Sequence, residues 1–206
     1  MTDNGRISVQ GTGSVSVRPD LARLRLRCLG EDDRAASAFD ACSSATAAVI
    51  AALREAGADD GDLSTSGIAL SQRHDDSRYI GMNTLVVTVR PPQRAGQVLA
   101  VAVEAGGDAL AIDNIQFDVA DDTEERSQAR AQAVLDARRI AEELAAAAGV
   151  RLGRLISLEE SGGWIAARPV GRMLSGAKAP VPVEVGDQEV AVSVSAVFEI
   201  ASDASA

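Results

Sequence analysis

The chain has 206 residues, of which 46% are hydrophobic and 24% charged, and its net charge is −10. This length suffices for one sizeable domain or two small ones. The acidic balance argues against duplex nucleic acid and anionic membrane surfaces as partners, because both need a basic footprint. Aromatic residues make up only 2% of the chain, so the core must consist of valine, isoleucine, leucine and alanine.

The N-terminal sequence bears on cellular location. The first ten residues, MTDNGRISVQ, contain neither the basic n-region nor the apolar h-region of a secretory signal peptide. No run approaches the roughly 20 apolar residues that a membrane-spanning helix needs. The sequence therefore predicts a cytoplasmic protein without a membrane span.

The first thirty residues show strand patterns. Before residue 20, two short alternating segments are separated by Gly11 and Gly13, which favours a turn or bulge between them. The next segment, LARLRLRCLGE, alternates apolar and basic residues, which predicts an antiparallel strand buried on one face. Its apolar side chains are Leu24, Leu26 and Cys28, and its basic ones, expected to be solvated or paired with acidic neighbours, are Arg23, Arg25 and Arg27.

An amphipathic helix is predicted over residues 34–57, with Gly57 ending it. Its buried face recurs at spacings of three and four residues and comprises Ala35, Phe39, Cys42, Thr46, Val49 and Leu53. Strands follow over about 63–73 and 79–90, joined by a polar turn, and a shorter helix is predicted over 93–106.

The second part of the chain repeats this order of elements. A strand (AIDNIQFDVA), a long helix, a strand (RLGRLISLEE) and a last alternating strand (QEVAVSVSAVFEI) follow one another. We therefore predict one α+β domain over residues 1–206, with two similar β-α-β-β halves at about 6–90 and 92–200. The sheet is expected to be mostly antiparallel with long helices packed on one face, and the tail 202–206 is expected to be disordered.

The long helix of the second half is rich in alanine and arginine. Thr123 is predicted to be its N-cap, and the acidic residues near its start suit the positive end of the helix dipole. The small apolar stripe that should let this helix approach a sheet closely comprises Ala133, Ala137, Ile140, Leu144 and Ala148.

The arginines of this helix have two interpretations. Pairs one turn apart are expected on its outer face, Arg138 with Glu142 and Arg139 with Glu143. Arg126 and Arg130 are the candidates for contact with a second subunit.

The segment 161–186 is predicted to be a flexible loop, because it is rich in glycine, proline and alanine and has no periodicity. It carries apolar side chains that have no place in a regular core, which indicates a surface for a protein partner. The residues expected to make that contact are Trp164, Arg168, Arg172, Met173 and Leu174.

No catalytic, cofactor or metal site is predicted. GTGSV, which begins at Gly11, lacks the third glycine and the lysine of nucleotide-binding loops. His74, the one histidine, sits in a polar turn beside Asp75 and Asp76, which would make an incomplete metal site. The acidic residues around 118–125 lack the spacing of a calcium loop. Cys28 and Cys42 are expected to be buried hydrophobes, with a disulfide between them left open.

Several segments together resemble the SIMPL-domain family, which includes YggE-like proteins and bacterial periplasmic immunogenic proteins. Residues 129–159 read AR-x-x-AV-x-DAR-x-x-A-x-x-LA-x-x-x-G-x-x-LG-x-x-x-x-x-E. The other matching segments are ISVQGTGSVSVRPDLARLRL, LSTSGIALSQR followed by Tyr79, DNIQFDV, and APVPVEVGDQEVAVSVSAVFEI. The resemblance covers about residues 6–200.

The resemblance implies an α+β fold with long helices on antiparallel sheet. It also implies ring- or barrel-like homo-oligomers for some members, a periplasmic or secreted location for many, and a link to oxidative-stress defence. It implies no catalytic residues. The chain departs from the family in showing no leader peptide.

The function predicted from these observations is a non-enzymatic, self-assembling SIMPL-domain protein with a role in stress response or as a scaffold. One alternative is an adaptor that docks a partner protein through loop 161–186. Another is a hydrolase that uses His74.

Overall fold

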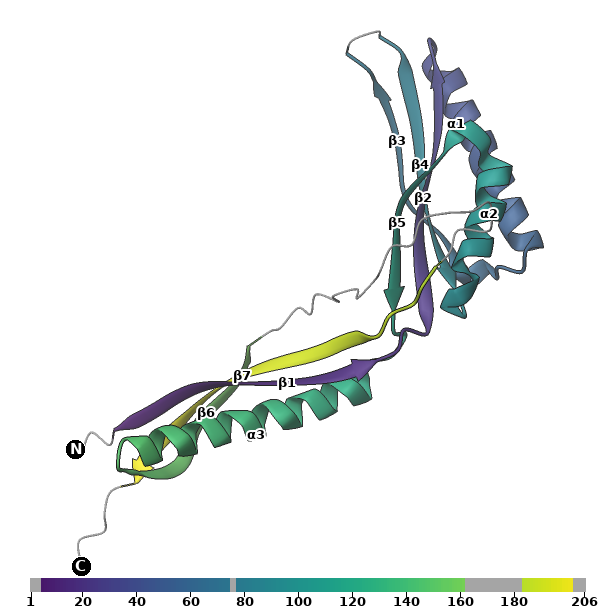
Figure 1. Ribbon diagram of the computed structural model, residues 1–206. Helices are drawn as coiled ribbons and strands as arrows, with labels where there is room; N and C mark the ends of the chain where they lie inside the picture. The colour runs from purple at the N-terminus through teal and green to yellow at the C-terminus, as the bar shows by residue number, and fades with distance from the viewer. Residues whose placement is uncertain (1–4, 75–76, 162–182, 202–206) are drawn as a thin grey trace, which may run out of the picture. The chain divides into compact units, whose positions relative to one another are not determined.

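The computed structural model describes residues 5–74, 77–161 and 183–201. These residues form two compact units (Figure 1). Unit 1 comprises residues 5–18, 121–161 and 187–201 of the described chain, and unit 2 comprises residues 19–74, 77–120 and 183–186.

Unit 1 is a three-stranded sheet with one long helix. Its strands are β1 (Arg6–Val17), β6 (Arg151–Ser161) and β7 (Gln188–Ala201), and its helix is α3 (Thr123–Ala147). The strand order is β1-β7-β6 and both pairings are antiparallel. β7 is therefore the central strand, and its inward-facing residues Val190, Val192, Val194, Ala196 and Phe198 are buried.

The core of unit 1 depends on a very close approach of α3 to the sheet. The buried face of α3 is a pure alanine stripe in steps of four: Ala129, Ala133, Ala137, Ala141 and Ala145. It lies against Gly11 and Gly13 of β1, where an added Cβ would come 2.2 Å from the carbonyl oxygens of Ala133 and Ala129 respectively. Only glycine leaves room for helix backbone at this distance.

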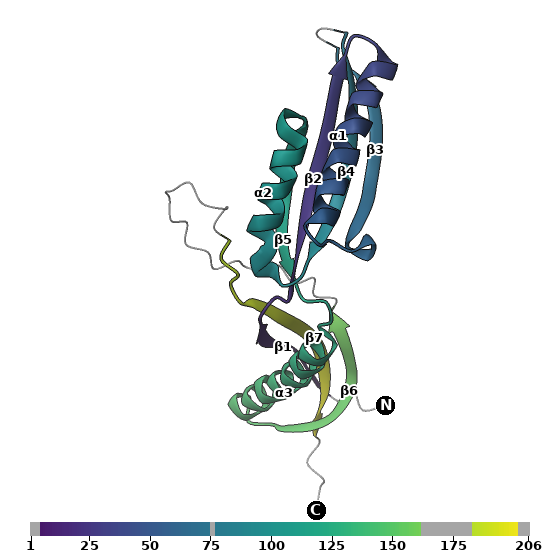
Figure 2. The same cartoon turned by 90° about the vertical axis from the view of Figure 1, so that its right-hand side faces the viewer.

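Unit 2 is a four-stranded antiparallel sheet with two helices on one face (Figure 2). Its strand order is β3-β4-β2-β5. The strands are β2 (Leu21–Asp32), β3 (Leu63–Gln72), β4 (Tyr79–Val89) and β5 (Leu110–Asp118), and the helices are α1 (Ala35–Glu55) and α2 (Ala95–Gly106). Short 3-10 turns precede β3, α2 and β5.

The core of unit 2 lies between α1, α2 and the two central strands. Its fully buried larger side chains include Leu24, Leu26, Leu53, Leu85 and Leu99. Here too glycines on paired strand positions, Gly30 and Gly81, bring a helix close, because a Cβ at either position would contact the backbone of Ala38. In both units, glycines on a strand face small residues on a helix, and this lets the helix pack closely against the sheet.

The predicted α+β class is confirmed, with antiparallel sheets and helices packed on them. The strand pairing crosses the predicted halves: β5 pairs with β2, and β1 pairs with β7. The organisation as a single domain of two halves, at about 6–90 and 92–200, stays a prediction.

Several local expectations need correction. The segment around Gly11 and Gly13 is one continuous strand rather than two strands with a turn. Thr123 is the first residue of α3 and Asp122 its N-cap, while the backbone N–H of Thr123 donates to Oδ1 of Asp121 (3.0 Å). Phe39 of α1 and Leu144 of α3, both expected to be buried, are exposed.

α1 has the length and apolar composition that a membrane-crossing helix would need. The same test is passed by core helices of soluble proteins, and one face of α1 packs on the sheet of unit 2. Its buried residues are Ala38, Cys42, Thr46, Val49 and Leu53. The absence of a membrane span stays a prediction.

Candidate interaction surface

The residues predicted for partner contact fall in two places. Trp164, Arg168, Arg172, Met173 and Leu174 of the predicted loop 161–186 lie outside the described residues. Arg126 and Arg130 lie on α3, where each forms an ion pair within unit 1. Arg126 pairs with Asp122, and Arg130 pairs with Glu160 of β6 through its Nε (2.8 Å) and Nη2 (3.4 Å). The contact of these two arginines with a second subunit stays a prediction.

The Arg130–Glu160 pair connects α3 to an edge of its own sheet. The hydrogen bond from Arg130, and then the charge of Arg130 and Arg126, hold the pKa of the Glu160 carboxyl below its ordinary value of 4.5. Because the folded-state pKa is depressed, any stabilisation is complete above that ordinary value and is lost as pH falls through the folded-state pKa. The contribution to stability is small because both side chains are largely solvated.

An Arg130→Met substitution is expected to raise the pKa of Glu160 towards its ordinary value, because it removes the hydrogen bond and the nearest positive charge. A pH titration of the Glu160 carboxyl carbon by NMR measures this shift. Arg138→Met is the matched control, because Arg138 pairs with Glu142 on the same helix. An unmoved Glu160 titration in Arg130→Met would contradict the pairing.

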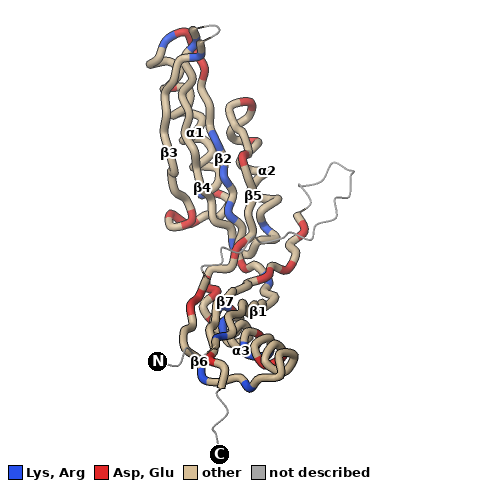
Figure 3. The backbone as a smooth tube through the Cα atoms, turned by 90° about the vertical axis from the view of Figure 1, so that its left-hand side faces the viewer, with Lys and Arg blue, Asp and Glu red and all other residues tan. Residues whose placement is uncertain are grey.

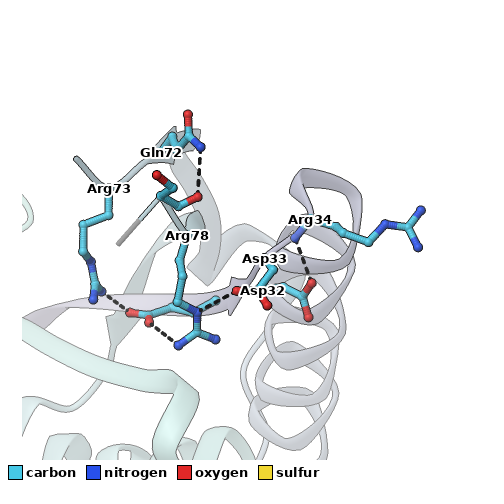
Figure 4. A network of polar contacts seen from close by, with 8 residues as sticks. Asp32, Asp33, Arg34, Gln72, Arg73 and Arg78 are labelled. Atoms are coloured by element: carbon cyan, nitrogen blue, oxygen red, sulfur yellow. Dashed lines mark hydrogen bonds and ion pairs between the residues drawn. The ribbon is translucent and has the colours of Figure 1, made fainter. Parts of the chain in front are cut away.

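A charged cluster occupies the end of unit 2 where β3 and β4 are joined (Figure 4). Arg73 donates to Glu31 (2.7 Å), and Arg78 lies 3.7 Å from Glu31 and 3.5 Å from Asp33. His74 is exposed in the same turn, and its sequence neighbours Asp75 and Asp76 lie outside the described residues. The hydrolase alternative that uses His74 stays a prediction.

The acidic residues near the start of α3 do not form a metal centre in the described part of the chain. Three or more histidine, cysteine, aspartate or glutamate side chains do not gather there in a way that could hold an ion. Asp121 instead accepts hydrogen bonds from Thr123, which hold the pKa of its carboxyl below the ordinary value.

Basic residues recur along β2 (Figure 3). Because Leu24, Leu26 and Cys28 are buried on the helix-covered face, the alternating residues Arg23, Arg25 and Arg27 lie on the opposite face of the sheet. Arg23 pairs with Asp118 (3.1 Å) and Arg27 with Asp113 (2.8 Å), both on β5. Of the two alternatives predicted for the β2 arginines, solvation or pairing with acidic neighbours, pairing holds for these two. Arg25 lies exposed between them. The row is therefore largely neutralised within its own sheet.

The edge strands of the two sheets are the remaining surfaces to which a strand of a partner could pair. The β1 edge is protected from such pairing by α3. The backbone N–H of Thr12 donates to Oδ2 of Asp136 (3.0 Å), and that of Ser14 to Oε1 of Gln132 (3.2 Å). Two side chains one helical turn apart thus occupy donors that an incoming strand would need. Such covering is a usual protection of edge strands.

Two other edges carry bulges and charges. β6 shows two register shifts against β7, and β5 shows one against β2. The charged residues on these two strands are Arg151, Arg154, Glu159, Glu160, Asp113 and Asp118. Bulges and charges both oppose continuous pairing with another strand.

β3 is the edge that has neither helix cover nor charge, and it carries one register shift against β4, between Thr65 and Gly67. Its sequence, LSTSGIALSQ, contains no charged residue and no proline, and it pairs with β4 alone. Nine of its ten residues are exposed, including Ile68 at 60% and Leu70 at 45%. We call this strand the β3 edge. A long, uncharged edge with exposed apolar side chains is a template for pairing with another strand.

The comparisons with known proteins cover nearly the whole chain. The family profile described as "SIMPL: Protein of unknown function (DUF541)" matches residues 7–198. The chain belongs to the SIMPL family. The 26 kDa periplasmic immunogenic proteins of Brucella melitensis biotype 1 and of Brucella abortus strain S19 are each 32% identical to this SIMPL protein over 221 residues, which covers 97% of this chain and 86% of theirs.

These findings confirm the resemblance and bear on location. Both relatives carry the word periplasmic in their names, which supports the location implied by the family. The cytoplasmic location expected for this SIMPL protein receives no support from them. Neither the family description nor the relatives' names assign an enzymatic activity.

The β3 edge was not identified from the sequence, although one signal was present. Residues 63–72 form a ten-residue stretch without charge in a chain that is 24% charged. The sequence pattern predicted the strand, but its position at the edge of the sheet follows only from the strand order β3-β4-β2-β5.

Proposed function

We propose that this SIMPL protein is a non-enzymatic scaffold that self-assembles by pairing the β3 edge of one chain with the β3 edge of a second. The observation that supports this most is the contrast between β3 and the three other edges. Those edges are covered by a helix or carry charged residues, whereas β3 is uncharged and exposes Ile68 and Leu70. Antiparallel pairing of two copies would join the two unit 2 sheets and satisfy backbone groups that now face solvent.

The absence of charge on β3 suits a second copy of the chain as the occupant. The charges that flank the strand are balanced within the chain, because Asp60 and Asp62 pair with Arg54 and Arg90, and Arg73 and Arg78 pair with Glu31 and Asp33. Two antiparallel copies of β3 therefore place no like charges opposite each other, although the whole chain carries −10.

The location and the wider role are parts of the same proposal. The names of the Brucella relatives support a periplasmic site of action for this chain. The link to stress response rests on the family resemblance. The adaptor alternative predicts that deleting residues 162–185 abolishes capture of a partner, and the hydrolase alternative predicts activity that is lost in His74→Ala.

The test of self-assembly is the absolute solution mass by light scattering at micromolar concentration. The full chain is expected at no less than twice its own 21.2 kDa. Ile68→Lys is expected at the single-chain mass, because two lysines would meet near the middle of the paired strands. Ile68 is 60% exposed, so the substitution leaves the core intact.

Ile112→Lys is the matched control for this experiment. Ile112 is 44% exposed on β5, the opposite edge of the same sheet, and its replacement is expected to leave the mass unchanged. A monodisperse single chain for the unsubstituted protein would contradict the proposal. So would an assembly that Ile68→Lys leaves intact.

A further inference from the structure

Two cysteines from different elements meet in the interface between α1 and the unit 2 sheet. Cys28 lies on β2 and Cys42 on α1, and both are buried and free. Thr46, one turn after Cys42, is a buried polar residue of this core. Asn83 lies directly opposite Cys28 on β4, and its Oδ1 is buried without a hydrogen-bond partner among the described residues. An otherwise apolar interface therefore holds a small polar cluster.

The contacts in this cluster bring the two thiols together. The Cys42 thiol donates to the carbonyl oxygen of Cys28 (3.4 Å). The Thr46 hydroxyl interacts with both thiols and also donates to the carbonyl oxygen of Cys42 (2.8 Å).

Glycines allow the helix to come this close. A Cβ added to Gly30 would lie 2.4 Å from the backbone nitrogen of Cys42, and one added to Gly81 would lie 3.1 Å from the Cβ of Cys42. Cys42 therefore lies over the paired positions Gly30 and Gly81, two residues along the same strand face from Cys28. Its thiol reaches the backbone of Cys28 from there.

We propose that Cys28 and Cys42 form a disulfide that joins β2 to α1 when the chain folds in the presence of a small-molecule disulfide. One cysteine thiolate attacks the small disulfide, which gives a mixed disulfide and releases one thiolate. The second cysteine thiolate then attacks the protein sulfur, forms the Cys28–Cys42 bond and releases the second small thiolate. The two protein protons end on the two released thiols, and the small disulfide takes both electrons.

Burial sets the timing of this reaction. Desolvation raises the pKa of both thiols, which keeps them protonated in the folded chain, and only the thiolate is the nucleophile. The bond is therefore made before α1 closes on the sheet, and reduced, folded protein reacts slowly. In the oxidising periplasm, the location proposed above, a protein disulfide would take the place of the small molecule. The chemistry itself can be tested without reference to location or assembly.

The test uses the full chain, unfolded, reduced and refolded in oxidised glutathione. Thiols are then labelled with a maleimide under denaturing conditions and the mass is measured. The expected product carries no label and is lighter than the reduced chain by two hydrogens. The same chain folded first in reductant, and then exposed to oxidised glutathione, is expected to keep both thiols far longer. Two labelled thiols after oxidative refolding, or disulfides only between chains, would overturn the proposal.

Stability gives a second measurement. The oxidised chain is expected to unfold at a midpoint about 5 °C or more above that of the reduced chain, because the bond constrains the unfolded state. The double variant Cys28→Ala with Cys42→Ala is the control, and its midpoint should be the same in both redox conditions. Equal midpoints for the oxidised and reduced natural chain would show that the bond does not hold α1 to the sheet.

Discussion

Gly11→Ala is expected to unfold unit 1 while unit 2 stays folded. The added Cβ would lie 2.2 Å from the carbonyl oxygen of Ala133 and 2.4 Å from the backbone nitrogen of Ala137. Both atoms belong to helix backbone, which cannot rotate away as a side chain can. Overpacking of a well-packed core typically costs about 1–3 kcal/mol, and a clash with rigid backbone belongs at or above the upper end of that range.

The small core of unit 1 makes this loss serious. α3 meets the sheet through alanines, which bury little apolar area per residue. Moving the helix outward to admit one methyl group would break contact along the whole stripe. The substitution therefore removes much of the unit's packing at once, rather than a single contact.

Residue-resolved hydrogen exchange distinguishes this outcome from a general loss of stability. Amides of β7 and α3 should lose protection in Gly11→Ala, while amides of β2 and β4 keep it. Gly61→Ala is the matched control, because an added Cβ there meets no atom within 4 Å. Equal protection of β7 in the two variants would show that the close approach of α3 is not essential.

Most of the helices and strands could be predicted from the sequence, because buried and exposed residues alternate within each strand. Arg23, Arg25 and Arg27 mark one face of β2, and the valines of β7 mark its buried face. The alanine-rich stripe of the long helix also predicted a close approach to a sheet. These features depend on spacing within one segment, which a single sequence displays directly.

The errors came from features that depend on distant parts of the chain. Gly11 and Gly13 favour a turn when they are considered alone, and the reason for them lies in the backbone of α3 more than a hundred residues later. Phe39 occupied a helical position three residues from Cys42, but the sheet below is covered by Ala38 and Cys42 because Gly30 and Gly81 draw α1 inward there. The pairing of β5 with β2 likewise has no local signal.

The β3 edge was missed for the same reason, because its position in the sheet depends on distant parts of the chain. A strand without charge can be a central strand or an exposed edge, and the amino-acid pattern of residues 63–72 does not separate the two. The protection of the β1 edge by Asp136 and Gln132 depends on the placement of α3. It could not be predicted from the sequence either. Only when all four edges are compared does β3 stand out as the one suited to a second strand.

Mixing two charged variants is expected to restore the assembly that each variant lacks. Ile68→Lys and Ile68→Glu should each remain single chains, because identical charges meet near the two-fold axis of an antiparallel β3 pair. In an equimolar mixture, lysine on one strand lies close to glutamate on the other. The repulsion becomes attraction, and a two-chain species should appear by light scattering.

This exchange of charge separates β3 pairing from indirect effects of the substitutions. If Ile68→Lys acted by loosening unit 2, adding a second weakened variant would not recover the assembled mass. The matched control mixes Ile112→Lys with Ile112→Glu, and each of these should assemble alone through an intact β3 edge. Raising the salt concentration should weaken the mixed assembly of the two Ile68 variants more than the unsubstituted assembly, because exposed charges are screened while the backbone pairing is not. A mixture that stays at the single-chain mass would place the contact between chains away from the middle of β3.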